Sequence, residues 1–136
     1  MDIEPKILLV DDEVNILRSV EKSLLREGFD VETARGNVEA SQWISEAIAD
    51  DEPFSLIIAD LNMPNFEGNE AKYAGLELLD WVKETAPNTP IIINSAWDEV
   101  ETAKQSIDRG AADYFVKGRN EEMLQKIRAV LGIADY

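Results

Sequence analysis

Phe54-Ser55-Leu56-Ile57-Ile58-Ala59, followed by Asp60, is the stretch that decides the fold of this chain. The run is apolar without polar alternation, which predicts a strand over 54–59 that is buried on both faces of a parallel sheet. Three further apolar runs end in the same way, in Asp11-Asp12-Glu13, in Ser95 and in Lys117. Because ligands of open α/β sheets bind beyond the carboxyl ends of the strands, we expect these polar groups to converge on one site.

Strand-like runs alternate with helical periods along the whole chain. We predict strands over 6–10, 30–34, 54–59, 90–94 and 113–116, and helices over 14–27, 37–49, 76–85, 98–108 and 120–131. This alternation predicts the α/β class, with five parallel strands covered by five helices and joined by right-handed crossovers. We expect one domain over 1–136, with a core over about 6–131. The segment 61–75 is a long polar connection beside Asp60, and such long loops are usually functional or mobile.

Local signals place the ends and faces of the predicted helices. Gly28 is expected to stop the first helix, and Asn120 is expected to cap the last one. In the helix over 98–108, Val100, Ala103 and Ile107 share one apolar stripe, which we expect to face the core.

Composition excludes several classes of function. A net charge of −15 opposes direct contact with nucleic acid or an anionic membrane, because the phosphates would repel the chain. The absence of cysteine excludes disulfides and thiolate metal sites, and the absence of histidine excludes Ser-His-Asp triads, HExxH zinc sites and a phosphohistidine in this chain. The first residues contain no apolar signal segment, and no run is long enough to span a bilayer, so we expect a cytoplasmic location.

The carboxylates at the strand ends predict a magnesium site. Clustered carboxylates repel one another unless a cation neutralises them, and Mg²⁺ prefers oxygen ligands. The acids of Asp11-Asp12-Glu13 could instead cap a helix and favour its dipole, but that interpretation does not explain Asp60 on another strand. Lys117 alone would be an ordinary loop lysine, and Ser95 alone a turn residue. Beside a phosphoryl group, both would contact its oxygens.

Four motifs on these elements together carry a family resemblance. They are Val10-Asp11-Asp12-Glu13, Asp60-Leu61-Asn62-Met63-Pro64 with Gly68, the hydroxyl of Ser95, and the run from Gly110 to Lys117. The chain resembles the receiver domain of two-component response regulators over about 6–131. The resemblance implies a flavodoxin-like, doubly wound sheet with strand order 2-1-3-4-5.

The resemblance also implies a metal-dependent phosphorylation site. Asp60 matches the residue that accepts a phosphoryl group from the phosphohistidine of a partner histidine kinase or histidine phosphotransfer protein. Asp12 would bind Mg²⁺ directly and Asp11 through water, while Asp60 and the backbone carbonyl of Asn62 would complete the protein ligands. Lys117 matches the invariant lysine of the family. Such a domain catalyses its own phosphorylation and dephosphorylation, and is a signalling switch rather than an enzyme.

Further positions match the switch and timing residues of the family. Ser95 corresponds to the switch hydroxyl and Tyr114 to the switch aromatic residue. Two positions tune the lifetime of the phosphoryl group, here Asn62 and Trp97, and we expect a bulky Trp97 to hinder attacking water. The resemblance further implies a downstream output domain or protein, and allows a homodimer through the last two helices and the fifth strand.

This chain departs from the family pattern in two places. Residues 69–75 form a seven-residue insertion before Leu76, which we expect either to shield the site, to contact a specific partner, or to be a tolerated surface insertion. Lys117 is followed by Gly118, where the family usually has a proline after a cis bond. A cis bond before a residue other than proline costs about 2.5–4 kcal/mol, so we expect either a trans bond with a shifted lysine or a strained cis bond.

Two alternatives remain at this point. A degenerate receiver would bind partners without being phosphorylated. A haloacid-dehalogenase-type phosphatase would also use an aspartate nucleophile with Mg²⁺, but that class needs Asp-x-Asp after its first strand, and Asp60-Leu61-Asn62 lacks the second acid.

Overall fold

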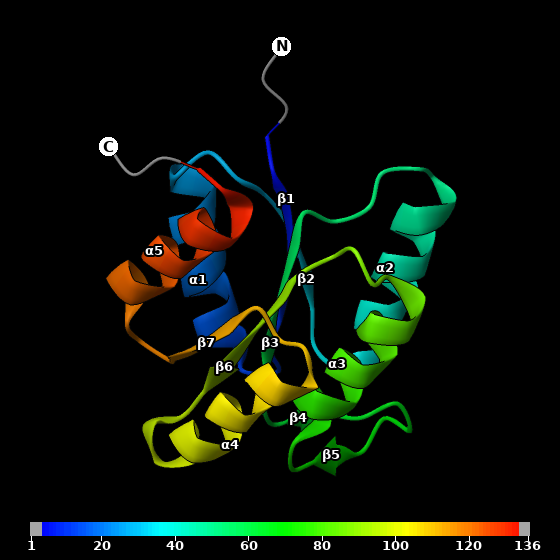
Figure 1. Cartoon of the computed structure of the whole chain (residues 1–136), viewed down its shortest axis with the longest axis vertical. Helices are drawn as coiled ribbons and strands as arrows, with labels where there is room; N and C mark the ends of the chain where they lie inside the picture. Colours follow the sequence, from blue (N-terminus) through cyan, green and yellow to red (C-terminus); the bar gives the residue numbers. More distant parts are fainter. Residues whose placement is uncertain (1–3, 134–136) are drawn as a thin grey trace.

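The computed structural model describes residues 4–133. Its centre is a parallel sheet in the order β2-β1-β3-β6-β7, formed by Lys6–Val10 (β1), Asp30–Ala34 (β2), Leu56–Asp60 (β3), Ile91–Ser95 (β6) and Asp113–Val116 (β7) (Figure 1). Counting only these strands, the order is the predicted 2-1-3-4-5. The flavodoxin-like α/β fold expected from the sequence is confirmed.

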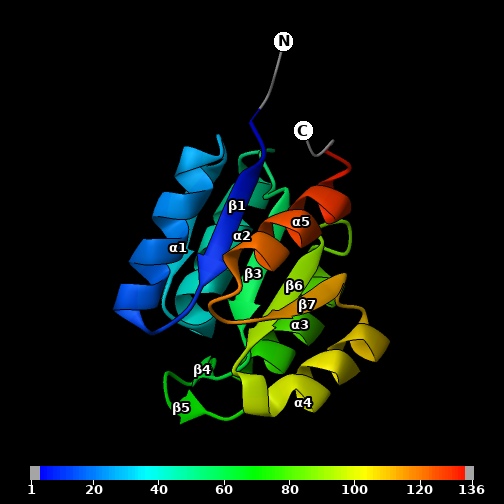
Figure 2. The same cartoon turned by 90° about the vertical axis from the view of Figure 1, so that its left-hand side faces the viewer.

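Helices cover both faces of the sheet. Val14–Arg26 (α1) and Asn120–Leu131 (α5) lie on one face, while Asn37–Ala49 (α2) and Ala74–Thr85 (α3) lie on the other (Figures 1 and 2). Successive residues of a strand point to opposite faces, so β1 contributes Leu8 to the core under α2 and α3, and Ile7 to the core under α1 and α5. The apolar strands lack alternation because both of their faces are buried.

The segment that leads from β3 to α3 contains a small hairpin, which the sequence pattern did not predict. Met63–Pro64 (β4) pairs antiparallel with Glu70–Ala71 (β5). The side chain of Asn65 closes the turn, since its Oδ1 accepts hydrogen bonds from the backbone N–H groups of Glu67 (2.9 Å) and Asn69 (3.1 Å). The inserted residues are therefore part of a hydrogen-bonded element.

Several predicted boundaries were wrong by a few residues. The helix expected over 98–108 is divided into a 3-10 turn at Trp97–Glu99 (η1), a short α-helix at Val100–Gln105 (α4) and a second 3-10 turn at Ser106–Arg109 (η2). This change in winding leaves Ile107 40% exposed rather than packed in the core. The N-cap of α5 is Arg119, and Asn120 is its first helical residue. The expected capping role of Asn120 was therefore wrong.

Candidate functional site

Strand pairing brings three aspartates together at the carboxyl edge of the sheet. Val10 at the end of β1 is opposite Ala59 of β3, so the next residues, Asp11 and Asp60, lie side by side. Asp11, Asp12 and Asp60 each offer a carboxylate oxygen, and these oxygens all lie within 4.8 Å of one another. Asp11 is 1% exposed and Asp60 5% exposed. Several oxygen donors at this spacing fit a hard divalent cation such as Mg²⁺.

Lys117 reaches this cluster from the end of β7. Its Nζ lies 2.8 Å from Asp60 Oδ2, 3.2 Å from Asp11 Oδ2 and 2.8 Å from Glu13 Oε1. No cis peptide bond occurs within 4–133, and Gly118 has φ +89°, a left-handed value that glycine adopts without a steric penalty. Of the two geometries expected from the sequence, the trans bond is therefore the one present, and the lysine still reaches the aspartates.

The surroundings of these groups alter their protonation. Burial raises the pKa of Asp60 from 3.8 to about 7, and the negative charge of Asp11 adds to this rise while Lys117 opposes it. Burial likewise raises the pKa of Asp11. Burial would lower the pKa of Lys117, but its hydrogen bonds to Asp60 and Glu13 raise it above its ordinary range. Lys117 is therefore a fixed positive charge, whereas Asp60 can exchange its proton near neutral pH.

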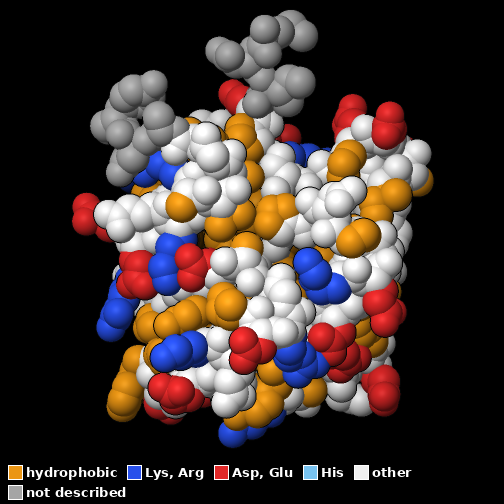
Figure 3. Space-filling view, viewed as in Figure 1, with side chains coloured by type: hydrophobic (Ala, Val, Ile, Leu, Met, Phe, Trp, Pro, Cys, Tyr) orange, Lys and Arg blue, Asp and Glu red, His pale blue; other side chains and the backbone are white. Residues whose placement is uncertain are grey.

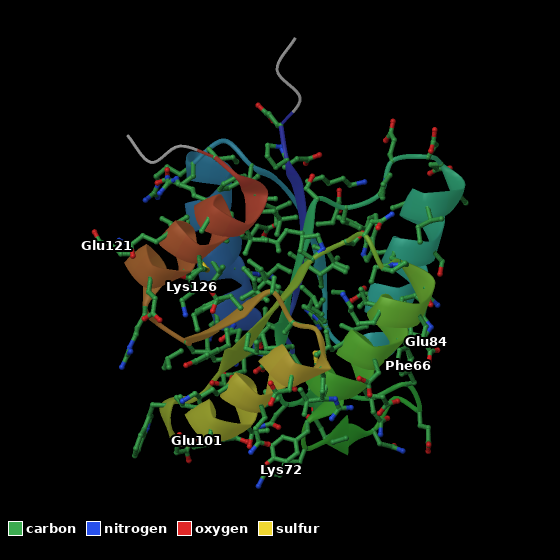
Figure 4. The ribbon with its side chains drawn as sticks, in the orientation of Figure 1. Phe66, Lys72, Glu84, Glu101, Glu121 and Lys126 are labelled. Carbon is green, nitrogen blue, oxygen red and sulfur yellow. The ribbon has the colours of Figure 1, made fainter. Side chains whose placement is uncertain are left out.

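Ser95 follows Asn94, the residue opposite Asp60, whereas Tyr114 lies further back in the sheet, opposite Ile93. Ser95 ends β6, is fully buried, and its Oγ has no hydrogen-bond partner among the described residues. A buried hydroxyl without a partner can donate to a new acceptor. Tyr114 on β7 is half-buried, and Nζ of Lys126 lies 4.7 Å from the centre of its ring. Lys126 extends from α5 (Figure 4).

The side chain of Asn62 has protein partners at both ends of its amide. Its Nδ2 donates to Glu99 Oε1 at 2.6 Å, and its Oδ1 accepts from the backbone N–H of Tyr73 at 2.9 Å. Trp97 is 78% exposed, so most of its indole lies in solvent. The predicted effect of Trp97 on attacking water remains a prediction, and any shielding by Trp97 would require its ring to move.

The inserted residues contribute two features that the sequence did not reveal. The carboxyl of Glu70 lies beside that of Asp12, and their hydrogen bond is the main cause that raises the pKa of Glu70. At Gly75 a Cβ atom would lie 2.3 Å from the backbone oxygen of Asp60, so only glycine allows this approach. Gly68, which the sequence matched to the family glycine, lies instead at the hairpin turn with φ +80°.

Site residues missed from the sequence are Glu13, Glu70, Tyr73 and Glu99. Glu13 ends the motif Val10-Asp11-Asp12-Glu13, and its position directly after two aspartates was the signal that could have predicted its ion pair with Lys117. The other three are brought to the site by the path of the β4–β5 hairpin and by the start of α4, for which the sequence contains no periodic signal.

The family model of the response regulator receiver domain matches residues 7–128. This chain belongs to that family. The response regulator MprA of Mycobacterium ulcerans is 35% identical over 127 residues, which are 93% of this chain and 50% of the relative. The receiver domain therefore spans about half the length of the curated relatives it matches.

Solved receiver domains have the same fold. The response regulator receiver domain protein from Clostridium thermocellum superposes with a TM-score of 0.80 at 25% identity, covering 94% of each chain. The response regulator TrrA from Thermotoga maritima, solved in complex with Mg²⁺ and BeF, superposes with a TM-score of 0.73 at 26% identity, covering 93% of this chain and 99% of that one. In the described part of this receiver domain, no helix is long and apolar enough to cross a membrane.

Proposed function

We propose that this receiver domain accepts a phosphoryl group on Asp60 from a phosphohistidine of a partner histidine kinase or histidine phosphotransfer protein. The observation that supports this most directly is the 2.8 Å contact of Lys117 Nζ with Asp60 Oδ2 within a cluster of three aspartates. Because these 136 residues contain no histidine, the donor lies outside them. The intact set of residues favours this function over a degenerate receiver that is never phosphorylated.

Positioning and electrostatics are the proposed basis of catalysis. The ionised Asp60 carboxylate attacks phosphorus, a P–O bond forms, and the P–N bond to the partner histidine breaks. The ammonium of Lys117 offsets charge on the phosphoryl oxygens during transfer. Asp11, Asp12, Asp60 and the Asn62 carbonyl would hold Mg²⁺, which when bound supplies further positive charge at those oxygens.

The switch residues would respond to the new charge. The buried Ser95 hydroxyl, which has no partner, would donate a hydrogen bond to a phosphoryl oxygen and move toward Asp60. Tyr114 could then turn into the space vacated by this movement, where it would change the surface formed by α4, β7 and α5. A depression on this surface is lined by Tyr114 and by residues of α4 and η2. We propose this face for contact with an output domain, a partner protein or a second receiver.

Acidic and basic side chains are interspersed on the face that includes α4 and α5, with apolar groups between them (Figure 3). A mixed surface of this kind suits a protein partner, because no large basic patch is present there to hold nucleic acid. We propose that the domain acts in the cytoplasm, where histidine kinases deliver phosphoryl groups.

The acceptor is tested by intact mass after incubation with acetyl phosphate. We expect wild-type protein to gain one phosphate-sized mass in the presence of Mg²⁺ and to gain none after chelation. Asp60→Ala should gain none under either condition, since it removes the carboxylate that would attack phosphorus. A gain in Asp60→Ala equal to that of wild type would refute Asp60 as acceptor, and no gain in wild type would favour the degenerate receiver.

The inserted segment is proposed to shield the site. Glu70 adds a carboxylate beside Asp12, which should repel anionic phosphodonors. Deleting 69–75 joins Glu67 and Gly68 to Leu76, so that Gly68 can take the place of Gly75 against the Asp60 backbone. We expect this deletion to speed phosphorylation by acetyl phosphate by about two- to fivefold.

The control is Glu70→Gln, which removes the charge and keeps the hairpin. If Glu70→Gln and the deletion both phosphorylate at the wild-type rate, with the same phosphoryl lifetime and partner binding, the segment is a tolerated surface insertion.

A further inference from the structure

The Asn62 carboxamide is held between two segments that are distant in the sequence. Glu99 at the start of α4 accepts from its Nδ2 at 2.6 Å, and the Tyr73 backbone before α3 donates to its Oδ1 at 2.9 Å. An amide has two donor hydrogens and one acceptor oxygen, so both of its polar ends are engaged. The bond to Glu99 is charge-assisted and therefore stronger than a bond between neutral groups.

The local structure fixes both partners of Asn62. The N–H of Glu99 donates to the Ala96 carbonyl at 3.0 Å, which closes the turn of η1. The second carboxylate oxygen of Glu99 is buried without a hydrogen-bond partner in the described residues. The Tyr73 hydroxyl lies 3.5 Å from Oγ1 of Thr102 on α4, which joins the same two segments a second time. Glu99 is also half-buried. These contacts and this burial allow Glu99 to hold the amide in one orientation.

The backbone of Asn62 lies at the acceptor. Its N–H hydrogen-bonds to the Asp60 carboxylate, so the Asn62 side chain begins beside the group that would be phosphorylated. A carboxamide in such a place can accept from a water molecule and orient it for attack on phosphorus, as a glutamine does in GTPases. While Glu99 and Tyr73 hold both ends of the amide, Asn62 cannot perform that role.

We propose that Glu99 is a positioning residue that lengthens the lifetime of the phosphoryl group by holding the Asn62 carboxamide away from attacking water. This inference rests on the proposed phosphorylation of Asp60. In the step concerned, water attacks phosphorus, the P–O bond to Asp60 breaks, and inorganic phosphate leaves. The proton lost by the water passes to a phosphate oxygen or to solvent.

The test measures the first-order loss of phosphate from Asp60 by intact mass, after phosphorylation with acetyl phosphate and Mg²⁺ and removal of the donor. Glu99→Ala removes the charge-assisted bond and leaves the amide held only by the backbone N–H of Tyr73. Because one such bond alone restrains the carboxamide less, the variant should lose phosphate faster by about three- to tenfold. Glu99→Gln keeps an oxygen that can accept from Asn62 and removes the charge, so its decay should stay within about twofold of wild type. Circular dichroism checks that each variant is folded.

A double-mutant cycle separates this role from a general structural one. In the Asn62→Ala background no carboxamide remains to be released, so adding Glu99→Ala should change the decay rate by less than about twofold. Unchanged or slower decay in Glu99→Ala would overturn the inference, as would equal acceleration by Glu99→Gln or an undiminished effect without Asn62. If wild type is phosphorylated but any of these contrary results is found, only the proposed role of Glu99 is refuted. A wild type that gains no phosphate overturns both this inference and the proposed phosphorylation of Asp60.

Discussion

Lys117→Met is expected to lower the rate of phosphorylation by acetyl phosphate by roughly 10²–10³, the loss typical for removing one preorganised group that stabilises a transition state. Lys117 is the cation placed 2.8 Å from Asp60 Oδ2 and 3.2 Å from Asp11 Oδ2. Its removal has two consequences, and both lower the rate of phosphorylation. The phosphoryl oxygens lose a positive charge during transfer, and the pKa of Asp60 rises further because Lys117 no longer opposes the effect of burial. Less of the proposed nucleophile, Asp60, is then ionised.

A pH profile distinguishes these two consequences. If the only effect were on the pKa of Asp60, raising the pH would restore the rate of Lys117→Met, because Asp60 would become ionised again. If Lys117 also acts on the phosphoryl oxygens, the variant should remain slow above the new pKa. Lys117→Arg is the matched control, since it keeps the charge and changes the shape of the side chain. We expect its phosphorylation rate to lie between those of wild type and Lys117→Met. A Lys117→Met rate within threefold of wild type at every pH would refute the catalytic role.

The sheet could be predicted from the sequence because its central strands β1, β3 and β6 are buried on both faces. Continuous apolar runs such as Leu56–Asp60 have few other stable locations, and each one ends in the polar group that lies at the site. Strand pairing then makes Asp11 and Asp60 neighbours without any further information. The convergence of the aspartates with Lys117 was thus a consequence of strand order, once the resemblance had supplied that order.

The parts that were not predicted depend on tertiary contacts. The β4–β5 hairpin has no alternating apolar pattern, and its turn is closed by the side chain of Asn65. The hydrogen bond between Asn62 and Glu99 joins two segments that are distant in the sequence, and the distance between these residues depends on how the chain enters α4. The helix expected over 98–108 is divided into η1, α4 and η2, and this change in winding shifts the faces of its side chains, which is why Ile107 was placed wrongly. Periodicity contains no information on any of these features.

The protonation of Asp60 leads to a prediction about stability. The pKa of this carboxyl is 3.8 for an ordinary aspartate in the unfolded chain and about 7 in the folded protein. Burial is the larger cause of this rise, and the negative charge of Asp11 adds to it. Between these two values the folded protein holds a proton that the unfolded chain has released. The free energy of unfolding therefore falls as the pH rises from about 4 to 7, and this contribution stays lost above pH 7. The difference of about 3 pKa units corresponds to roughly 4 kcal/mol, an upper value for this one group.

Asp60→Asn tests this prediction, because asparagine keeps the shape of the side chain and cannot ionise. In urea denaturation with a chelator present, we expect the variant to be more stable than wild type at pH 8 by up to about 4 kcal/mol, and the two proteins to converge near pH 4. Adding Mg²⁺ should narrow the difference in stability at pH 8, since a cation bound at the ionised site would stabilise the folded wild type. A variant that is less stable than wild type at pH 8 would mean that the attraction between Asp60 and Lys117 exceeds the cost of burying the carboxylate. In that case Asp60 would be ionised well below neutral pH, and phosphorylation would persist in acidic buffer.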